Sequence, residues 1–231
     1  MNDHYERIMS QLKLEEFIPQ QAPLRLQVAN FLRDSILTGN LKPGERIVER
    51  SLARSLGVGQ ATVREALQVL EHEGLIFKKT NTASFVTQLS AEQVSEMVEI
   101  RLELEPKAFV LAHRRRTSAH LDELHSVVSR IEEGVGTNDY YQVTRDDLAF
   151  HQKVWRIARN QTLERILWQL CAPLFPYLMV LLSVSQSPLK ERVKSHQILM
   201  DALAGTDEEN VIQAARDHIS NSWYRFLPPE E

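Results

Sequence analysis

The sequence predicts a mainly α-helical chain with a small N-terminal domain and a larger, all-α C-terminal bundle. From residue 91 onward, apolar residues recur at helical spacing with few interruptions, whereas residues 21–89 combine short helical runs with one hairpin pattern. With 231 residues, 43% of them hydrophobic, and only eight glycines, the chain can bury a sizeable core. We therefore expect an N-terminal extension at 1–20, one domain at 21–89 and the bundle at 90–231.

Charge is distributed unevenly along the chain. The net charge is −4, yet residues 21–88 carry nine Lys and Arg against six Asp and Glu, a surplus of +3, while residues 89–231 sum to −5. A mildly basic segment of this kind is typical of a part that meets a polyanion. The single cysteine, Cys171, excludes an internal disulfide, and the first residues show no apolar signal-peptide segment, so a cytoplasmic protein is expected.

One long uncharged stretch, Ile166–Leu189, has the length of a membrane span. It contains Gln169, Pro173, Pro176 and several serines, and no second stretch of this kind accompanies it. These features favour a buried helix, and no membrane partner is expected.

Two helices joined by a tight turn are predicted in the front domain, after a first helix that ends at Gly39. Gly57 stands where the earlier helix of the pair must stop in a left-handed turn. The apolar faces on the two sides of that turn are Leu52, Ala53 and Leu56, then Val63, Ala66, Leu67 and Leu70. This spacing is typical of a helix–turn–helix, whose second helix can enter a major groove.

A hairpin is predicted next, from the runs LIFKK and SFVTQL around the polar turn TNTA. Such a hairpin would form the wing of a winged helix–turn–helix, and Lys78 and Lys79 lie where phosphates could be met. Any small helical domain with a hairpin would give a similar pattern.

Three motifs within residues 24–88, I..G.L.PGE, LA..LGV and VREAL..LE.EGL, together resemble the winged helix–turn–helix of the GntR family of bacterial transcription regulators. The resemblance implies DNA contacts from Arg50, Gln60 and Arg64. Gly59-Gln60 replaces the usual Ser-Arg, and Thr62, included here among the DNA-binding candidates, replaces the usual Pro. The wing also lacks the glycine that often forms its tip.

The residue types at the start of the predicted recognition helix bear on base preference. Arg favours guanine and Gln favours adenine, so Gln60 is predicted to shift operator preference at one base pair per half-site. Arg64 lies on the outer helix face and is predicted to contact DNA. The alternative is a surface ion pair of Arg64 with Glu65 or in the neighbourhood of Gln68.

In the predicted bundle, three helices each turn a histidine inward. Asp147 and His151 are four residues apart and share a face with apolar residues, while His196 and His218 each lie within the apolar stripe of a later helix. The predicted helices are 91–114, 118–133, 139–159, 162–184, 188–204 and 207–226.

Burying an unpaired carboxylate costs several kcal/mol, so Asp147 needs compensation. A divalent cation held by Asp147, His151, His196 and His218 would explain all four residues together. The alternative is a set of separate, hydrogen-bonded core histidines, with Asp147 paired to an arginine such as Arg101 or Arg145.

The segments VEIRLELEPKAFVLA, DLAFH, RNQTLERIL, SHQILMDAL and AARDHI resemble the ligand-binding domain of the FadR subfamily, the FCD domain. The resemblance implies that Asp147, His151, His196 and His218 ligate a metal at the floor of a pocket, and that Arg101 meets an effector carboxylate. Ser195 stands where the family usually has Glu, which leaves the support of His196 open. Further candidates for the pocket wall are Arg145, Asn160 and Tyr177, although Asn160 also fits a helix cap.

The prediction is a metabolite-responsive transcription regulator, by default a repressor, which reads an inverted repeat as a homodimer and binds a small organic acid at a site for zinc, nickel, manganese or iron. The near absence of a linker at 88–92 would couple the two domains. One alternative is a metal-dependent enzyme acting on a hydroxy or amino acid, for which Glu105 is the only further carboxylate in a matching context. Another is a regulator that binds its ligand without metal.

Overall fold

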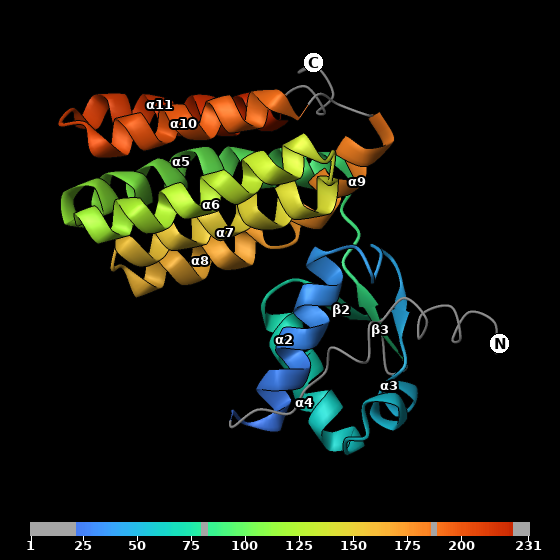
Figure 1. Cartoon of the computed structure of the whole chain (residues 1–231). Coiled ribbons are helices and arrows are strands. Elements are labelled where there is room, and N and C mark those ends of the chain that lie inside the picture. The colour runs from blue at the N-terminus through green and yellow to red at the C-terminus, as the bar shows by residue number, and fades with distance from the viewer. Residues whose placement is uncertain (1–21, 80–82, 186–188, 224–231) are drawn as a thin grey trace. The chain divides into compact units, whose positions relative to one another are not determined.

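The computed structural model describes residues 22–79, 83–185 and 189–223. The chain divides into two compact units, Met1–Gln88 and Leu89–Glu231, and each is described by itself. The predicted fold class is confirmed, with a winged helix–turn–helix in the first unit and a helical second unit (Figure 1). The predicted N-terminal extension, most of the hairpin tip and the end of the last predicted helix lie outside the described residues.

The first unit combines three described helices with a small antiparallel sheet. The strands follow the order β1-β3-β2, and Phe85 of the central strand faces both Arg46 and Phe77. The elements are α2 (Leu24–Leu37), β1 (Arg46–Ile47), α3 (Glu49–Leu56), α4 (Gln60–His72), β2 (Ile76–Lys79) and β3 (Ala83–Val86). The hairpin of β2 and β3 is the predicted wing.

The turn between α3 and α4 has the predicted geometry. Gly57 adopts the left-handed conformation, with φ of 66°, and the amide of Val58 donates to the carbonyl of Ala53 over 3.0 Å. The inner face of α4 buries Val63, Ala66, Leu67 and Leu70. That burial leaves Gln60 and Arg64 exposed on the outer face of α4.

The described part of the second unit is helical throughout. Ser90 and Gln93 form a capping box that starts α5 at Ala91, the residue at which the sequence predicted this helix to begin. Helix α5 packs against α11, α7 and α8, while α6 packs against α7 and α10. The helices are α5 (Ala91–Arg115), α6 (Ser118–Gly136), α7 (Tyr140–Ile157), α8 (Gln161–Cys171), α9 (Leu174–Ser185), α10 (Lys190–Ala204) and α11 (Glu208–Trp223).

One predicted helix, 162–184, is wrong as a single element. The structure has two helices there, α8 and α9, separated by Ala172 and Pro173. Pro173 has no N–H to continue the hydrogen-bond ladder of α8. Pro176 is tolerated because it lies in the first turn of α9, where the amide has no partner within the helix.

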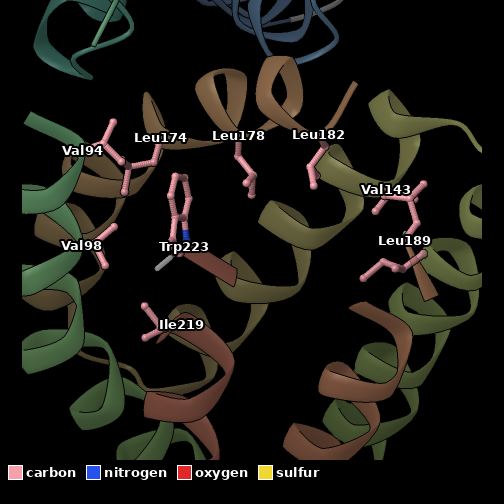
Figure 2. Close-up of a cluster of buried hydrophobic side chains, with 10 residues drawn as sticks. Val94, Val98, Val143, Leu174, Leu178, Leu182, Leu189, Ile219 and Trp223 are labelled. Carbon is pink, nitrogen blue, oxygen red and sulfur yellow. The ribbon is translucent and has the colours of Figure 1, made fainter. Parts of the chain in front are cut away.

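The apolar stretch that contains α8 and α9 contributes to the core. Leu174, Leu178 and Leu182 follow one another along α9, with Trp223 below the α9 helix in Figure 2. By length and composition alone Gln161–Ser185 could cross a membrane, but 56% of its most apolar window is buried inside the protein. That burial is a property of core helices.

Candidate functional site

Four side chains from three helices converge inside the second unit. Helix α7 supplies Asp147 and His151, α10 supplies His196 and α11 supplies His218. These four residues, called the Asp–His cluster below, are all buried, and their candidate ligand atoms lie within 4.8 Å of one another. The sequence placed each histidine on an inward face, and the structure shows that the three faces meet.

The inward-facing atoms are spaced as ligands of one ion would be. Asp147 Oδ1 lies 3.2 Å from His196 Nε2 and 3.3 Å from His151 Nε2, and His151 Nε2 lies 3.1 Å from His218 Nε2. Two donors ~2.1 Å from a common ion, at tetrahedral or octahedral angles, are ~3.0–3.4 Å apart. One carboxylate oxygen with three imidazole nitrogens is also a donor set that first-row divalent metals accept, so the residues fit a metal.

The outward-facing nitrogen of each ring has its own neighbour. His196 Nδ1 lies 2.7 Å from the carbonyl oxygen of Arg192, and His218 Nδ1 lies 3.2 Å from Ser195 Oγ. His151 Nδ1 lies 2.7 Å from Glu105 Oε1, a close contact between the ring and a buried carboxylate. Such outer partners fix the ring orientation of metal-binding histidines. Ser195 therefore supports His218, and a backbone carbonyl supports His196.

Burial and neighbouring charge act in opposite directions on the pKa values of the two acids at this site, Asp147 and Glu105. Burial would raise the pKa of Asp147, but His196, His151 and Arg192 outweigh it and hold that pKa well below its usual range. Burial likewise opposes ionisation of Glu105, yet Arg101 and His151 lower its pKa to about 2. Both acids are therefore carboxylates at neutral pH.

Two of the histidines differ in their electrostatic surroundings. Burial lowers the pKa of His218 well below its usual range, and the neighbouring His196 and His151 lower it further, so His218 is neutral and able to act as a ligand. Burial would also lower the pKa of His151, but the negative charge of Glu105 raises it. Glu105 thus favours positive charge at His151, whether from a proton or from a coordinated cation.

Arg101, which the resemblance assigns to an effector carboxylate, lies at the edge of the Asp–His cluster, where it contacts Glu105 and His151. Its Nε donates to Glu105 Oε2 over 2.5 Å, and its Nη2 lies 3.2 Å from His151 Nε2. Trp155 Nε1 donates to the other oxygen of Glu105 over 2.8 Å. Glu105, which the sequence offered only as a further carboxylate for enzymatic chemistry, is thus a buried anchor for both Arg101 and His151.

Arg192 is a second residue that the sequence reasoning missed. Its Nη1 donates to Asp147 Oδ2 over 2.6 Å, and the pair is buried. The sequence suggested Arg101 or Arg145 as the arginine for Asp147; the structure corrects this to Arg192. One oxygen of Asp147 therefore meets the guanidinium while the other faces the imidazoles.

The structure does not bring Arg145 and Asn160 into the Asp–His cluster. Arg145 donates to Asp146 over 3.0 Å, and about half of its side chain is exposed. It precedes Asp147 by two residues, which turns it roughly 200° away around the helix. Asn160 caps α8 by accepting the amide of Leu163 over 3.1 Å. Tyr177 is half-buried against the apolar core of the second unit.

In the first unit, the six DNA-binding candidates lie on α3, α4 and the wing. Thr62 is half-buried and the other five are exposed. Lys78 forms an ion pair with Glu71 over 3.2 Å. Arg64 forms an ion pair, but its partner is Glu49 of α3, at 3.1 Å, rather than Glu65. The five exposed candidates are Arg50 on α3, Gln60 and Arg64 on α4, and Lys78 and Lys79 on β2.

A winged helix–turn–helix is a DNA-binding fold, and in this chain a helical domain with the buried Asp–His cluster follows it. Residues 24–86 match the bacterial regulatory proteins of the gntR family, and residues 96–221 match the FCD domain. The chain belongs to the GntR family, within its group of FCD-domain regulators. It is a DNA-binding transcription regulator and not an enzyme, which settles the enzymatic alternative.

Curated relatives agree with this assignment. The chain is 29% identical over 187 residues to the HTH-type transcriptional regulator McbR of Escherichia coli, covering 80% of this chain and 85% of that one. It is 30% identical over 196 residues to a probable D-xylose utilization operon transcriptional repressor of Paenarthrobacter nicotinovorans, covering 84% of each. The solved structure of E. coli McbR/YncC superposes with a TM-score of 0.79 at 26% identity, covering 89% of this chain and 99% of that chain.

Proposed function

We propose that this regulator is a homodimer that binds an inverted-repeat operator through α4 and the wing, and that a small organic acid bound at a metal site in the second unit changes its affinity for DNA. Repression relieved by the acid is the expected direction, and the cytoplasm, where the DNA is, the expected location. The observation that carries the proposal is the convergence of Asp147, His151, His196 and His218 on one buried point.

The residues of the Asp–His cluster would hold the cation through Asp147 Oδ1 and the three Nε2 atoms. A bound divalent ion supplies Lewis acidity and open coordination positions for an oxygen ligand. Glu105, Ser195 and the carbonyl of Arg192 hold the outer side of the rings. Phe109, Phe150, Trp155 and Phe175 surround His151, and their rings keep bulk water away from this side of the cluster.

The balance of buried charge favours an anionic effector. Arg101 and Arg192 carry two positive charges, and Glu105 and Asp147 carry two negative charges, so the four buried side chains already cancel. With neutral imidazoles, the charge of a divalent ion is left to be balanced by a ligand, because uncompensated buried charge is costly. Arg101 Nη2, beside His151 Nε2, offers a donor to a carboxylate bound at this edge.

For binding to regulate, the acid must favour one arrangement of the DNA-binding domains over another. In the sequence, only a few residues separate the end of the wing at Val86 from the start of α5 at Ala91. Such a short connection favours transmission of a change in the second unit to the first.

The proposal predicts that Gln60 sets base preference at one position of each half-site. In Gln60→Arg, we expect selection from randomised DNA to shift that position from adenine toward guanine, because the two side chains pair with different base edges. Gln68→Arg, which adds the same charge on the exposed side of α4, is the control. An unchanged consensus in Gln60→Arg would show that Gln60 reads no base.

A second prediction concerns the ion pair of Arg192 with Asp147. In metal-free protein, we expect Arg192→Met to lower the free energy of unfolding by about 3–5 kcal/mol, because a buried carboxylate loses its guanidinium. Saturating metal should recover part of this loss, since Asp147 then has a cation on its other oxygen. Denaturant unfolding with chelator and with added metal measures both values, with Lys194→Met, an exposed neighbour, as control. Equal losses in both conditions would argue against a metal at Asp147.

A thermal-shift screen of carboxylic acids tests the proposed effector site. With added Zn²⁺, Ni²⁺, Mn²⁺ or Fe²⁺, an acid that binds the cluster should raise the melting temperature of the wild type, and chelator should remove the shift. A shift that is the same with and without metal would favour a metal-free ligand site, the remaining alternative. Metal content of protein purified without chelator or nickel resin separates the two accounts independently.

A further inference from the structure

Glu49, the first residue of α3, lies among the side chains that the proposed function assigns to base contact. Its Oε2 lies 3.1 Å from Arg64 Nη2, 3.2 Å from Arg64 Nε and 3.4 Å from Gln60 Nε2. All three donors come from the exposed face of α4, and all three meet one oxygen. No motif or helical pattern in the sequence singles out Glu49.

This contact has little to contribute to the stability of the fold. The side chain of Arg64 is 57% exposed and that of Glu49 is 23% exposed, and ion pairs in such positions are weak and screened by salt. A negative charge on a surface that approaches phosphates also opposes DNA binding in general. The charge of Glu49 therefore weakens DNA binding unless its carboxylate accepts a hydrogen bond from a donor on the DNA.

The geometry of Arg64 leaves part of its guanidinium for another acceptor. A guanidinium has five N–H donors, and Glu49 engages the edge formed by Nε and Nη2. The edge formed by Nη1 and Nη2 is the one that can pair with the O6 and N7 atoms of guanine. Arg64 can thus contact a base while it remains held by Glu49.

The two side chains together carry a donor–donor–acceptor pattern. In the major groove, a G·C pair presents the acceptors N7 and O6 of guanine followed by the N4 amino donor of cytosine. Two donors from Arg64 and one carboxylate oxygen from Glu49 complement that row. An A·T pair sets the N6 amino donor of adenine against the guanidinium and the O4 acceptor of thymine against the carboxylate, and a reversed C·G pair likewise sets a donor against the guanidinium and an acceptor against the carboxylate. A T·A pair sets the thymine methyl group where the guanidinium would meet N7 of guanine, so one of the three hydrogen bonds is lost.

We propose that Glu49 is a specificity-determining residue of DNA recognition, which holds Arg64 on guanine and accepts a hydrogen bond from the N4 amino group of the paired cytosine. This inference rests on the proposed role of α4 in reading the operator. Glu49 would restrict one position of each half-site to G·C, and it would disfavour non-specific DNA by its charge.

The expected effect of Glu49→Ala is a loss of discrimination rather than a loss of binding. Selection by the full-length protein from randomised duplex DNA should show one position per half-site that becomes degenerate. At that position the preference of wild type for G·C over A·T, roughly 5- to 100-fold, should fall to near parity. Affinity for non-specific DNA should rise at the same time, because a negative charge is removed from the interface.

Glu65→Ala is the matched control, because it removes the same charge from an exposed position next to Arg64. It should raise non-specific affinity without changing the consensus. Glu49→Gln, which keeps the shape of the side chain, should lose part of the discrimination. If Glu49 merely favours the N-terminus of α3 as an acidic residue there, melting temperature would change and the consensus would not.

Arg64→Ala separates failure of this inference from failure of the proposed function. If Arg64→Ala loses the G·C preference while Glu49→Ala selects the wild-type consensus, α4 still reads the operator and only the role of Glu49 is overturned. If Arg64→Ala itself selects the wild-type consensus with unchanged affinity, the assignment of α4 residues to bases is overturned as well. Loss of preference at the same position in both variants, with Glu65→Ala unchanged, supports the inference.

Discussion

His196→Ala is expected to reduce the bound metal from about one equivalent per chain to well below that value. His196 supplies one of four ligand atoms, and its Nε2 lies 3.2 Å from Asp147 Oδ1, the only oxygen ligand of the cluster. Without that ring, three ligands remain, and the buried cavity left by the side chain weakens their placement. Elemental analysis of dialysed, metal-loaded protein measures the stoichiometry.

His125→Ala is the control for this measurement. His125 is exposed on α6, and its Nδ1 lies against the carbonyl of Leu121, outside the Asp–His cluster. Its loss should leave metal content unchanged. If His196→Ala retains as much metal as wild type, or if His125→Ala loses an equal amount, the cluster is not the site of binding.

Arg64→Ala is expected to cause the largest loss of specific DNA binding. A bidentate contact to guanine contributes ~1–3 kcal/mol, and a dimer on an inverted repeat makes it twice, so affinity should fall roughly 30-fold or more. Non-specific binding should change far less, since it depends on the total charge. Fluorescence anisotropy with operator and scrambled duplexes, at one fixed salt concentration, gives both affinities.

Arg54→Ala provides the charge-matched comparison for Arg64. Arg54 is exposed near the end of α3 and is not among the residues proposed to contact bases. Loss of the Arg54 side chain should lower the affinities for operator and for scrambled DNA by similar, small factors. Equal losses in Arg54→Ala and Arg64→Ala would reduce the role of Arg64 to electrostatics.

Much of the fold was predictable because its signals are local. Gly57 marked the left-handed turn between α3 and α4, and Ser90 marked the start of α5. Helical periodicity placed His151, His196 and His218 on inward faces, but periodicity describes one helix at a time. That the three faces converge follows only from the packing of α7, α10 and α11, which the structure supplies.

The missed residues share a physical reason. Glu105 and Arg192 are charged side chains, whereas the inward faces in the bundle were identified from apolar residues, so neither contributed to the pattern. A local signal did exist, since Arg192 precedes His196 by four residues and Glu105 follows Arg101 by four. A charged residue one helical turn from an inward-facing polar residue is a candidate for the buried site. The contacts of Arg192 with Asp147 and of Glu105 with His151, however, each join two different helices, so one helix alone does not predict them.

Two prolines in the sequence indicate the break between α8 and α9. Pro173 and Pro176 are both visible in the sequence, and the uniform apolar character of the run made a single helix plausible. The contact of Glu49 with Arg64 had no signal of this kind. It joins residues fifteen positions apart across the turn, and neither helix pattern specifies it.

The central claim of the proposed regulation is that an acid bound at the metal site of the Asp–His cluster changes the affinity of the protein for its operator. The direct measurement is the operator affinity of metal-loaded protein, by anisotropy, while an acid identified by thermal shift is titrated. We predict a change of about 5-fold or more in wild type and none in His218→Ala, provided that this variant still binds operator. A response that persists undiminished in His218→Ala, or a wild type that binds the acid with no change in operator affinity, would contradict the account.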